Sequence, residues 1–206
     1  MHRLYATPGS GNCFKPQLLM NQMGIPYETV WIDVLRGAHR SLDYLAINPE
    51  GTVPFLRLAC GDELSESNAM LWALAERSDL MPEPGIETAL AVQWMIVEQT
   101  KLEPFIAPAR VYTTLLPHMT TEKAFEIDAW RAKAENGLNR LQRHLSKSAF
   151  MLGPRYTIVD IALFGYVHVA EEAGIDMERF PDITRWCAAV RARPGYVPMD
   201  VLAEAA

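Results

Sequence analysis

The fold follows from residues 3–33, which read RLYATPGSGNCFKPQLLMNQMGIPYETVWID. Their first four residues are strand-like, residues 8–11 form a turn, and residues 14–23 carry apolar side chains in a helical register that ends at Gly24. Residues 27–33 are rich in β-forming side chains, which predicts a second strand reached by a right-handed crossover. The segment therefore reads as a βαβ unit.

A hairpin and a helix complete this first α/β part of the chain. Residues 53–58 and 63–64 predict the two strands of the hairpin, and the helix begins near Ser67. The apolar face of that helix consists of Met70, Leu71, Leu74 and Ala75. The predicted order of elements over residues 1–78 is β-α-β-α-β-β-α.

A break at residues 79–85 ends the α/β pattern, because two prolines and a glycine stop any helix there. From residue 86 onward the apolar period is helical. One predicted stripe is Ile86, Leu90, Trp94 and Val97, and another is Ile127, Ala134, Leu138, Leu141 and Leu145. Thr157 and Asp160 form a capping-box pattern at the start of a buried helix. We therefore predict an α/β domain over 1–78, a linker over 79–85 and an all-helical domain over 86–206.

Composition and charge exclude several classes of protein. The chain has 206 residues, half of them hydrophobic, and a net charge of -6, which is typical of a globular protein and offers no basic stripe to follow phosphates. No apolar run reaches the ~18 residues of a membrane span, and no signal core follows Met1. We expect a cytoplasmic protein with no nucleic acid or membrane partner. Cys13, Cys60 and Cys187 are widely separated, so we expect no disulfide and no metal site.

Residues 5–15 place a glycine-containing turn between a strand and the start of a helix. The unpaired N–H groups and the positive dipole of such a helix start stabilise an anion, for example a thiolate. Ser10 supplies a hydroxyl donor and Asn12 an amide donor, and neither ionises. The alternative is that one of these residues only caps the helix, and the local sequence leaves both open.

The same turn also suggests a dinucleotide loop, because Gly9 and Gly11 follow a strand and Asp33 lies about twenty residues further on. The position of the third glycine in that motif is Phe14 here. The α/β part also ends near residue 78, which is too short for a doubly wound domain. The dinucleotide interpretation therefore fails.

Two further segments offer polar groups. A proline that opens a strand, as Pro54 does, is usually trans, but a cis Val53–Pro54 bond would expose the Val53 backbone for pairing with an extended peptide. Glu66 and Ser67 stand where a helix starts. They either cap it or bind an amino acid group, with Glu66 taking the ammonium and Ser67 with the N–H groups taking the carboxylate.

Together these motifs resemble the bacterial cytosolic glutathione S-transferase family, in its serine-type, theta- or nu-like form. In the first part of the chain the resemblance is carried by Ser10-Gly11-Asn12-Cys13-x-Lys15, His39 in a Gly-x-His turn, Asn48-Pro49 with Val53-Pro54, and Glu66-Ser67-Asn68-Ala69. In the second part it is carried by Gln93-Trp94-Met95, Glu98-Gln99, Glu103-Pro104 and Thr157-Ile158-Val159-Asp160-Ile161-Ala162. The resemblance covers essentially the whole chain.

The resemblance implies a thioredoxin-like first domain with a cis Val53–Pro54 bond, an all-α second domain, and a homodimer. It implies glutathione as co-substrate and no metal. Ser10 matches the hydroxyl that holds the glutathione thiolate, with Asn12 beside it. The residues that match the contacts to the rest of the tripeptide are Thr52, Val53 and Pro54 for the cysteinyl backbone, Glu66 and Ser67 for the γ-glutamyl group, and His39 for the glycine carboxylate.

Two residues of the first domain receive no catalytic role. Tyr5 lies in the first strand, before the position at which tyrosine-type classes carry their hydroxyl. Cys13 falls three residues after the serine, so we expect a buried thiol near the helix start.

The activity that the resemblance implies is conjugation of the glutathione thiolate to small hydrophobic electrophiles, a detoxification reaction. Candidates for the second-substrate pocket are Phe105, Arg110, Tyr112 and Phe164, with core packing as the alternative for each. Two other functions stay open. One is glutathione-dependent reduction of disulfides or peroxides, and the other is a non-catalytic glutathione-binding module on the same fold.

Overall fold

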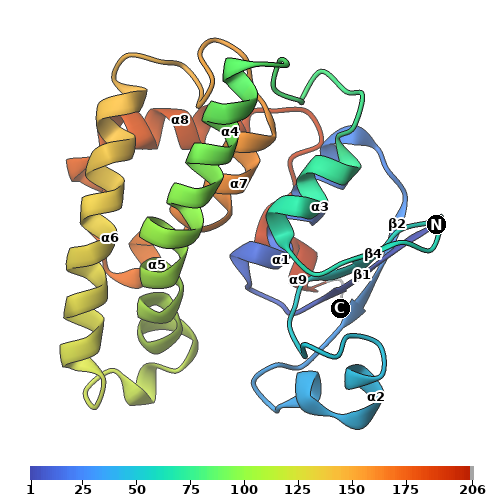
Figure 1. The fold of residues 1–206 in the computed structure, drawn as a ribbon. Coiled ribbons are helices and arrows are strands. Elements are labelled where there is room, and N and C mark those ends of the chain that lie inside the picture. Colours follow the sequence, from blue (N-terminus) through green and yellow to red (C-terminus); the bar gives the residue numbers. More distant parts are fainter. Residues whose placement is uncertain (205–206) are drawn as a thin grey trace. The chain divides into compact units, whose positions relative to one another are not determined.

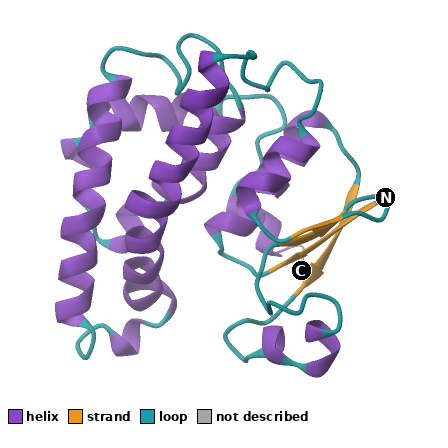
Figure 2. Ribbon diagram, viewed as in Figure 1, coloured by secondary structure: helices purple, strands orange, loops and turns teal. Residues whose placement is uncertain are grey.

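The computed structural model describes residues 1–204, and the chain separates into two compact units (Figures 1 and 2). Within the described residues, the first unit contains residues 1–78 and 193–204, and the second contains residues 79–192. The division after residue 78 falls where the sequence analysis ends the first domain. The segment from Arg193 differs, because the sequence analysis assigns it to the helical domain.

The first unit is built on a four-stranded sheet. Its elements are β1 (His2–Ala6), α1 (Gly11–Met23), β2 (Tyr27–Trp31), α2 (Leu42–Leu45), β3 (Phe55–Arg57), β4 (Glu63–Leu64), α3 (Ser67–Leu74) and the C-terminal α9 (Met199–Glu204). The strand order is β2-β1-β3-β4, with β2 parallel to β1, β3 antiparallel to β1, and β4 antiparallel to β3. This is the predicted order β-α-β-α-β-β-α and a thioredoxin-like arrangement, so the fold prediction is confirmed.

Side chains on β1 alternate between the two faces of the sheet. Tyr5 packs on one face with Tyr44 from α2 and Phe55 from β3, at ring-centroid distances of 6.0 and 5.8 Å. Leu4 and Ala6 point to the opposite face and are fully buried. The helices α1 and α3 pack side by side, and they cover that second face (Figure 1).

The segment from Arg193 onward reaches the first unit through a contact that only glycine permits. Gly195 has a φ of 74°, and a Cβ there would lie 2.7 Å from the backbone oxygen of Asn21 near the end of α1. The sequence pattern marks Pro194 and Gly195 only as the end of a helix. It carries no signal for this contact, which explains why the domain prediction extends the helical domain too far.

The second unit is helical, as predicted (Figure 2). Its helices are α4 (Ile86–Val97), α5 (Glu103–Arg110), α6 (Ala124–Leu145), α7 (Ile158–Val167) and α8 (Pro181–Arg191), and π-helical turns follow α4 (Glu98–Leu102) and α5 (Val111–Leu115). The stripe predicted on α6 is buried along its whole length. No helix within residues 1–204 combines the length and the apolar character that a membrane span requires.

The stripe predicted on α4 is wrong at its start. Ile86 and Leu90 are 75% and 38% exposed. The buried side of the helix carries Ala91, Trp94 and Met95 and continues to the fully buried Glu98. This set follows the three- and four-residue spacing of one helix face. The sequence prediction instead linked apolar residues and passed over a buried carboxylate.

Asp160 joins three parts of the second unit. The Thr157 hydroxyl accepts from the N–H of Val159, and the Asp160 carboxylate accepts from the N–H of Thr157 at 2.9 Å, so the predicted capping box is confirmed. The same carboxylate also accepts from the backbone N–H of Met151 and from the indole N–H of Trp186, each at 2.9 Å. Asp160 is fully buried and thereby holds α7, α8 and the loop before α7 together.

We predict that Asp160→Ala strongly destabilises the protein. The change leaves three buried N–H donors without an acceptor, and each unsatisfied buried group costs about 1–3 kcal/mol. Urea denaturation should therefore show a loss of roughly 3–5 kcal/mol in the free energy of unfolding. Asp128→Ala is the matched control, because the Asp128 side chain is 78% exposed, and it should change stability by less than about 0.5 kcal/mol. Equal stabilities for the two variants would contradict the role given to Asp160.

Candidate functional site

Three segments of the first unit meet at one edge of its sheet. β1 ends in the turn that carries Ser10, β3 begins after Val53, and β4 ends before Glu66. Because β3 is antiparallel to both β1 and β4, its start lies beside the ends of the other two strands. The topology therefore gathers the residues that the sequence analysis selected for glutathione.

Ser10 is the N-cap of α1. Its backbone is extended, with φ -84° and ψ 121°, and its Oγ accepts from the N–H of Cys13 at 3.3 Å. The capping alternative is therefore correct for this residue. A hydroxyl that accepts one bond still has its hydrogen to donate, so capping does not exclude a bond from Ser10 to an anion.

Cys13 lies in the first turn of α1, three residues after Ser10. Its side chain is buried, and its Sγ accepts from the N–H of Thr7 at 3.4 Å. Burial raises the pKa of the Cys13 thiol to about 11, although bonds from Ser10 and Thr7 oppose the rise. The group is therefore a protonated thiol at neutral pH, the buried thiol expected from the sequence.

A buried lysine connects the turn to the start of α3. Lys15 is fully buried, and its Nζ donates to Asn12 Oδ1 at 2.9 Å. It also donates to Ser67 Oγ at 3.3 Å and to Asn68 Oδ1 at 3.4 Å. The Ser67 hydroxyl donates in turn to Asn12 Oδ1 at 3.2 Å. We call Lys15, Asn12, Ser67 and Asn68 the lysine network.

No role is predicted for Lys15 from the sequence, although the sequence contains a signal for its burial. Lys15 directly follows Phe14 and precedes the apolar Leu18 to Met20 run by three residues, at a helical position that should face the core. Lysine is almost never fully buried unless its ammonium is bonded. Partners therefore had to exist, but which residues they are depends on the packing of α1 against α3.

The start of α3 is not capped by its own side chains. Glu66 has the extended backbone of an N-cap residue, but its exposed carboxylate accepts no capping bond. The Ser67 hydroxyl is committed to Asn12. Within residues 1–204, the first-turn N–H groups of Ser67 and Ala69 have no acceptor. The capping alternative therefore fails for Glu66 and Ser67, and the helix start presents open donors, where an anion is stabilised.

Two side-chain hydrogen bonds hold the loop before β3. The Tyr44 hydroxyl and the buried Asn48 amide both donate to the carbonyl of Thr52, at 2.6 and 2.9 Å. The Val53–Pro54 bond is cis, so the expectation from the resemblance is confirmed and the trans expectation from pattern alone is wrong. Within residues 1–204, the backbone N–H and C=O of Val53 have no hydrogen-bond partner.

His39 lies against this loop. A Cβ on Gly51, whose φ is 62°, would lie 2.8 Å from the His39 carbonyl, so the glycine allows the two segments to approach closely. The Nδ1 atom of His39 is buried and has no partner within residues 1–204. The structure thus brings His39 beside the loop of Thr52 and Val53, and its role in binding stays a prediction.

Two of the four pocket candidates in the second unit are half-buried aromatic residues. The ring of Phe105 lies beneath the ammonium of Lys133, with 5.4 Å from Nζ to the ring centroid. Tyr112 stacks on Trp130 at a centroid distance of 5.9 Å. For Phe105 and Tyr112 a place in the second-substrate pocket stays a prediction.

The other two candidates are more deeply placed. Arg110 is buried, and its Nε lies 2.6 Å from Oε2 of Glu172. Phe164 is fully buried, stacked on His168 at 4.5 Å and edge-on to Trp186 at 6.0 Å. The core-packing alternative describes the position of Phe164. A pocket role for these two residues remains an untested prediction.

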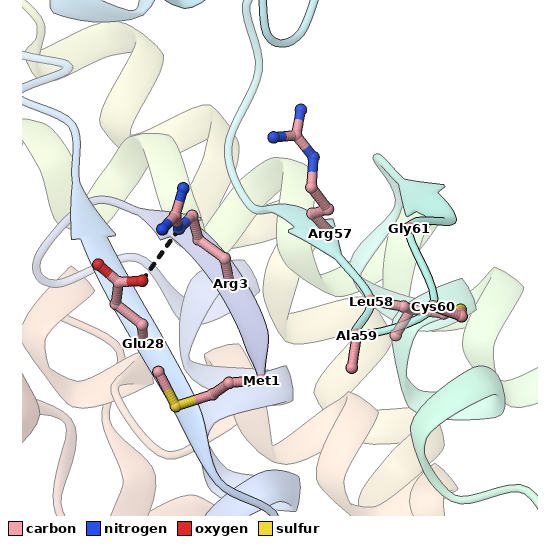
Figure 3. Close-up of a pocket in the computed structure, with 8 residues that line it drawn as sticks. All are labelled: Met1, Arg3, Glu28, Arg57, Leu58, Ala59, Cys60 and Gly61. Carbon is pink, nitrogen blue, oxygen red and sulfur yellow. Dashed lines mark hydrogen bonds and ion pairs between the residues drawn. The ribbon is translucent and has the colours of Figure 1, made fainter.

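A surface hollow lies at the opposite edge of the first unit's sheet (Figure 3). It is lined by Met1, Arg3, Glu28, Arg57, Leu58, Ala59, Cys60 and Gly61. The two arginines are paired, Arg3 with Glu28 at 3.0 Å and Arg57 with Glu63 at 2.7 Å. The hollow is therefore separate from the edge that carries Ser10.

The cysteines of the first and second units differ in exposure. All three are free, with Cys60 exposed and Cys13 and Cys187 buried. Burial raises the pKa of Cys187 to about 12. In the part of the chain that the structure describes, no group of three or more His, Cys, Asp or Glu side chains is placed to hold a metal ion.

Comparisons with known proteins agree with this architecture. Residues 9–77 match the family described as Glutathione S-transferase, N-terminal domain, and residues 124–189 match Glutathione S-transferase, C-terminal domain. A crystal structure of a glutathione S-transferase from Pseudomonas fluorescens is 37% identical, covers 96% of this chain and 98% of that chain, and has a TM-score of 0.92.

Two more distant relatives differ in what their names describe. The disulfide-bond oxidoreductase YfcG of Escherichia coli is 25% identical over 198 residues, which are 93% of this chain and 90% of that protein. A glutathione transferase from Burkholderia graminis, solved with two glutathione molecules bound per subunit, is 24% identical with a TM-score of 0.80. It covers 94% of this chain and 85% of that chain, and it shares the fold.

A thioredoxin-like unit with donors gathered at one sheet edge, followed by an all-helical unit, defines a two-domain class of proteins. The matched regions and the 37% identity over nearly the whole of both chains identify the member of that class. The chain belongs to the glutathione S-transferase family.

We predict that thiol reagents distinguish Cys60 from the other two cysteines. The thiolate is the reactive form, and a pKa of about 11 leaves only about one Cys13 in a thousand ionised at pH 8. Titration of the native protein with Ellman's reagent at pH 8 should show one fast thiol per chain, with the other two reacting only on unfolding. Cys60→Ser should remove the fast phase. Loss of the fast phase in Cys13→Ser instead would show that Cys13 is the activated thiol.

Proposed function

We propose that this protein binds glutathione at the edge defined by Ser10, Val53 and Glu66 and adds its thiolate to electrophilic carbon atoms of small hydrophobic molecules. The observation that carries the proposal is the uncapped start of α3 beside the donors of the α1 turn. A polar ligand that carries an amino acid group, with its carboxylate and ammonium, and a thiol matches these groups. Family membership supports glutathione as that ligand.

Each part of glutathione has a partner in this proposal. The γ-glutamyl carboxylate takes the open N–H groups of Ser67 and Ala69, and the ammonium takes the exposed Glu66 carboxylate. The unpaired backbone of Val53 pairs with the cysteinyl unit, between Thr52 and Pro54. The sulfur accepts hydrogen bonds from the Ser10 hydroxyl and the Asn12 amide. The carboxylate at the glycine end of glutathione lies toward His39.

The Ser67 hydroxyl has a different role from the one expected. It donates to Asn12 and accepts from Lys15, so it is not directed at a ligand. We propose that Ser67 binds the glutamyl carboxylate through its backbone N–H. The hydroxyl then serves the lysine network.

A reductase acting on glutathione disulfides is the second candidate function, and the named activity of the E. coli relative favours it. The Burkholderia neighbour was solved with two glutathione molecules bound per subunit, and a reductase that forms glutathione disulfide would also have to bind two glutathiones. Initial rates with a chlorinated aromatic electrophile and with a glutathione mixed disulfide, measured side by side, separate the two. Turnover of the disulfide alone would overturn conjugation, and glutathione binding by calorimetry without either turnover would indicate a non-catalytic module.

We further propose a cytoplasmic homodimer with a role in detoxification. The apolar residues Met70, Trp94 and Met95 are buried within the chain, so they belong to the core and do not form an interface. The exposed apolar side chains of α4 support the dimer instead. Val92 and Ile96 are 45% and 56% exposed and lie one turn apart on the same helix face.

We predict that Val92→Lys combined with Ile96→Lys converts a dimer into a monomer in sedimentation velocity at micromolar concentration. Two charges in an apolar interface would lose their hydration without gaining partners. Leu42→Lys, at a side chain 85% exposed on α2, is the control and should leave the dimer intact. A parent protein that sediments as a monomer would refute the dimer itself.

We predict that Ser10→Ala raises the pKa of the bound glutathione thiol and lowers turnover near neutral pH, with partial recovery at alkaline pH. Both effects follow from loss of the hydroxyl donor to the thiolate. The thiol is titrated by its ultraviolet thiolate absorbance in the complex, alongside the pH profile of turnover. Ser10→Thr, which keeps the hydroxyl, should resemble the parent.

The control for this prediction is another serine cap in the same unit. Ser41 caps α2 and accepts from the N–H of Tyr44 at 3.2 Å, in the same way that Ser10 accepts from Cys13. Ser10→Ala and Ser41→Ala should each lose about 1 kcal/mol of stability. Only Ser10→Ala should shift the thiol pKa, and equal pKa values in both variants would leave Ser10 as a cap alone.

A further inference from the structure

The lysine network contains a constraint on the direction of the Asn12 side chain. An amide group has an acceptor oxygen and a donor nitrogen of nearly the same size, and its orientation is decided by the hydrogen bonds around it. The ammonium of Lys15 only donates. The Asn12 atom that faces Lys15 at 2.9 Å is therefore the oxygen.

Ser67 reinforces the same orientation. Its hydroxyl also donates to Asn12 Oδ1, at 3.2 Å, so two donors from within the chain meet on that oxygen. The Asn12 nitrogen is the other branch of the same planar amide, and it therefore points away from these two donors. Within residues 1–204 that nitrogen has no hydrogen-bond partner, and Asn12 is only partly buried, so its two N–H groups are open to a ligand.

We infer that Lys15 is a positioning residue that fixes the Asn12 amide with its N–H groups directed to the glutathione sulfur. This inference rests on the proposed function. The lysine does not touch the ligand. It acts by removing the alternative amide orientation, in which the Asn12 oxygen would face and repel the thiolate.

The burial of Lys15 suits it to this task. A fully buried ammonium cannot exchange its partners for water, so losing the bond to Asn12 would leave a charge poorly solvated. A hydrogen bond from a charged donor is also stronger than one between neutral groups. The amide orientation is therefore more firmly held than that of an asparagine on an open surface.

Other titratable groups near the network do not replace Lys15. Cys13 stands on the same turn of α1, and its pKa of about 11 keeps it uncharged over the range in which a bound thiol titrates. Glu66 immediately precedes α3 and carries the opposite charge. Among the described residues, the bonds to Asn12 Oδ1 come from Lys15 and Ser67, and none comes from Cys13 or Glu66.

The test compares Lys15→Met, Asn12→Ala and the double variant. Methionine has a similar length but no donor, so the Asn12 amide is freed to turn. The bound-thiol pKa should rise by about one unit, a tenfold fall in the ionisation constant, for each single variant. The double variant should show no further rise, because both changes remove the same donor. A further rise in the double variant, or an unchanged pKa in Lys15→Met, would overturn the inference.

Binding at low pH separates positioning from damage to the site. At pH 5.5, where the bound thiol is protonated in the variants, the glutathione dissociation constant of Lys15→Met should stay within about threefold of the parent, since Glu66, Val53 and the start of α3 are intact. A merely structural role would weaken binding at every pH. Lys15→Arg, which also only donates, should restore the parent pKa, and Lys147→Met is the control for net charge at an exposed lysine.

Asn12→Asp keeps the inference testable if Lys15→Met does not fold. This variant keeps an acceptor oxygen for Lys15 and replaces only the outward nitrogen with a second oxygen. The bound-thiol pKa should then rise by more than in Asn12→Ala, and an equal or smaller rise would overturn the inference. Failure of the proposed function is recognised separately, because the parent itself would then fail to bind glutathione or would show no lowered thiol pKa.

Discussion

A buried ammonium must keep its hydrogen bonds, and Lys15 keeps them only while α1 and α3 lie side by side. Its partners are Asn12 on its own helix and Ser67 and Asn68 at the start of the other. The packing of α1 against α3 and the geometry of the proposed thiol site therefore depend on the same hydrogen bonds of Lys15. Any movement that separates the helices would leave the buried ammonium without partners. Its free-energy cost would exceed that of losing apolar contacts alone.

The two helix starts at this edge satisfy their N–H groups differently. The start of α1 is capped by Ser10, whereas the start of α3 leaves N–H groups open because Glu66 and Ser67 direct their side chains elsewhere. Open donors reduce stability, and natural proteins retain such local losses mainly where a ligand restores them. The first unit thus combines a rigid turn, which fixes donors for the sulfur, with an unsatisfied helix start that gains most from binding.

Local signals predicted most of the fold, and contacts between distant segments account for the errors. Gly24 ends α1 in a left-handed conformation, and Thr157 with Asp160 forms the capping box, because turn and cap chemistry depends on neighbouring residues. Two of the Lys15 partners, Ser67 and Asn68, lie more than fifty residues away, and Gly195 contacts Asn21 across most of the chain. Local and distant signals differ within the site in the same way. Its residues could be named from motifs, but the motifs could not show that the Ser67 side chain bonds to Asn12 whereas the Glu66 side chain makes no capping bond.

Thiol activation at this site explains only part of a catalytic rate. If the thiol pKa falls by about two units from ~8.5, the ionised fraction at pH 7 rises from about 3% to about 75%. A less basic thiolate is also a weaker nucleophile, by roughly eightfold for that shift, so the net gain is about threefold. Most of any large acceleration must then come from holding the electrophile close to the sulfur in a productive geometry. Among the predicted pocket residues, Phe164 is enclosed in the core and Arg110 pairs with Glu172, whereas Phe105 and Tyr112 are half-buried.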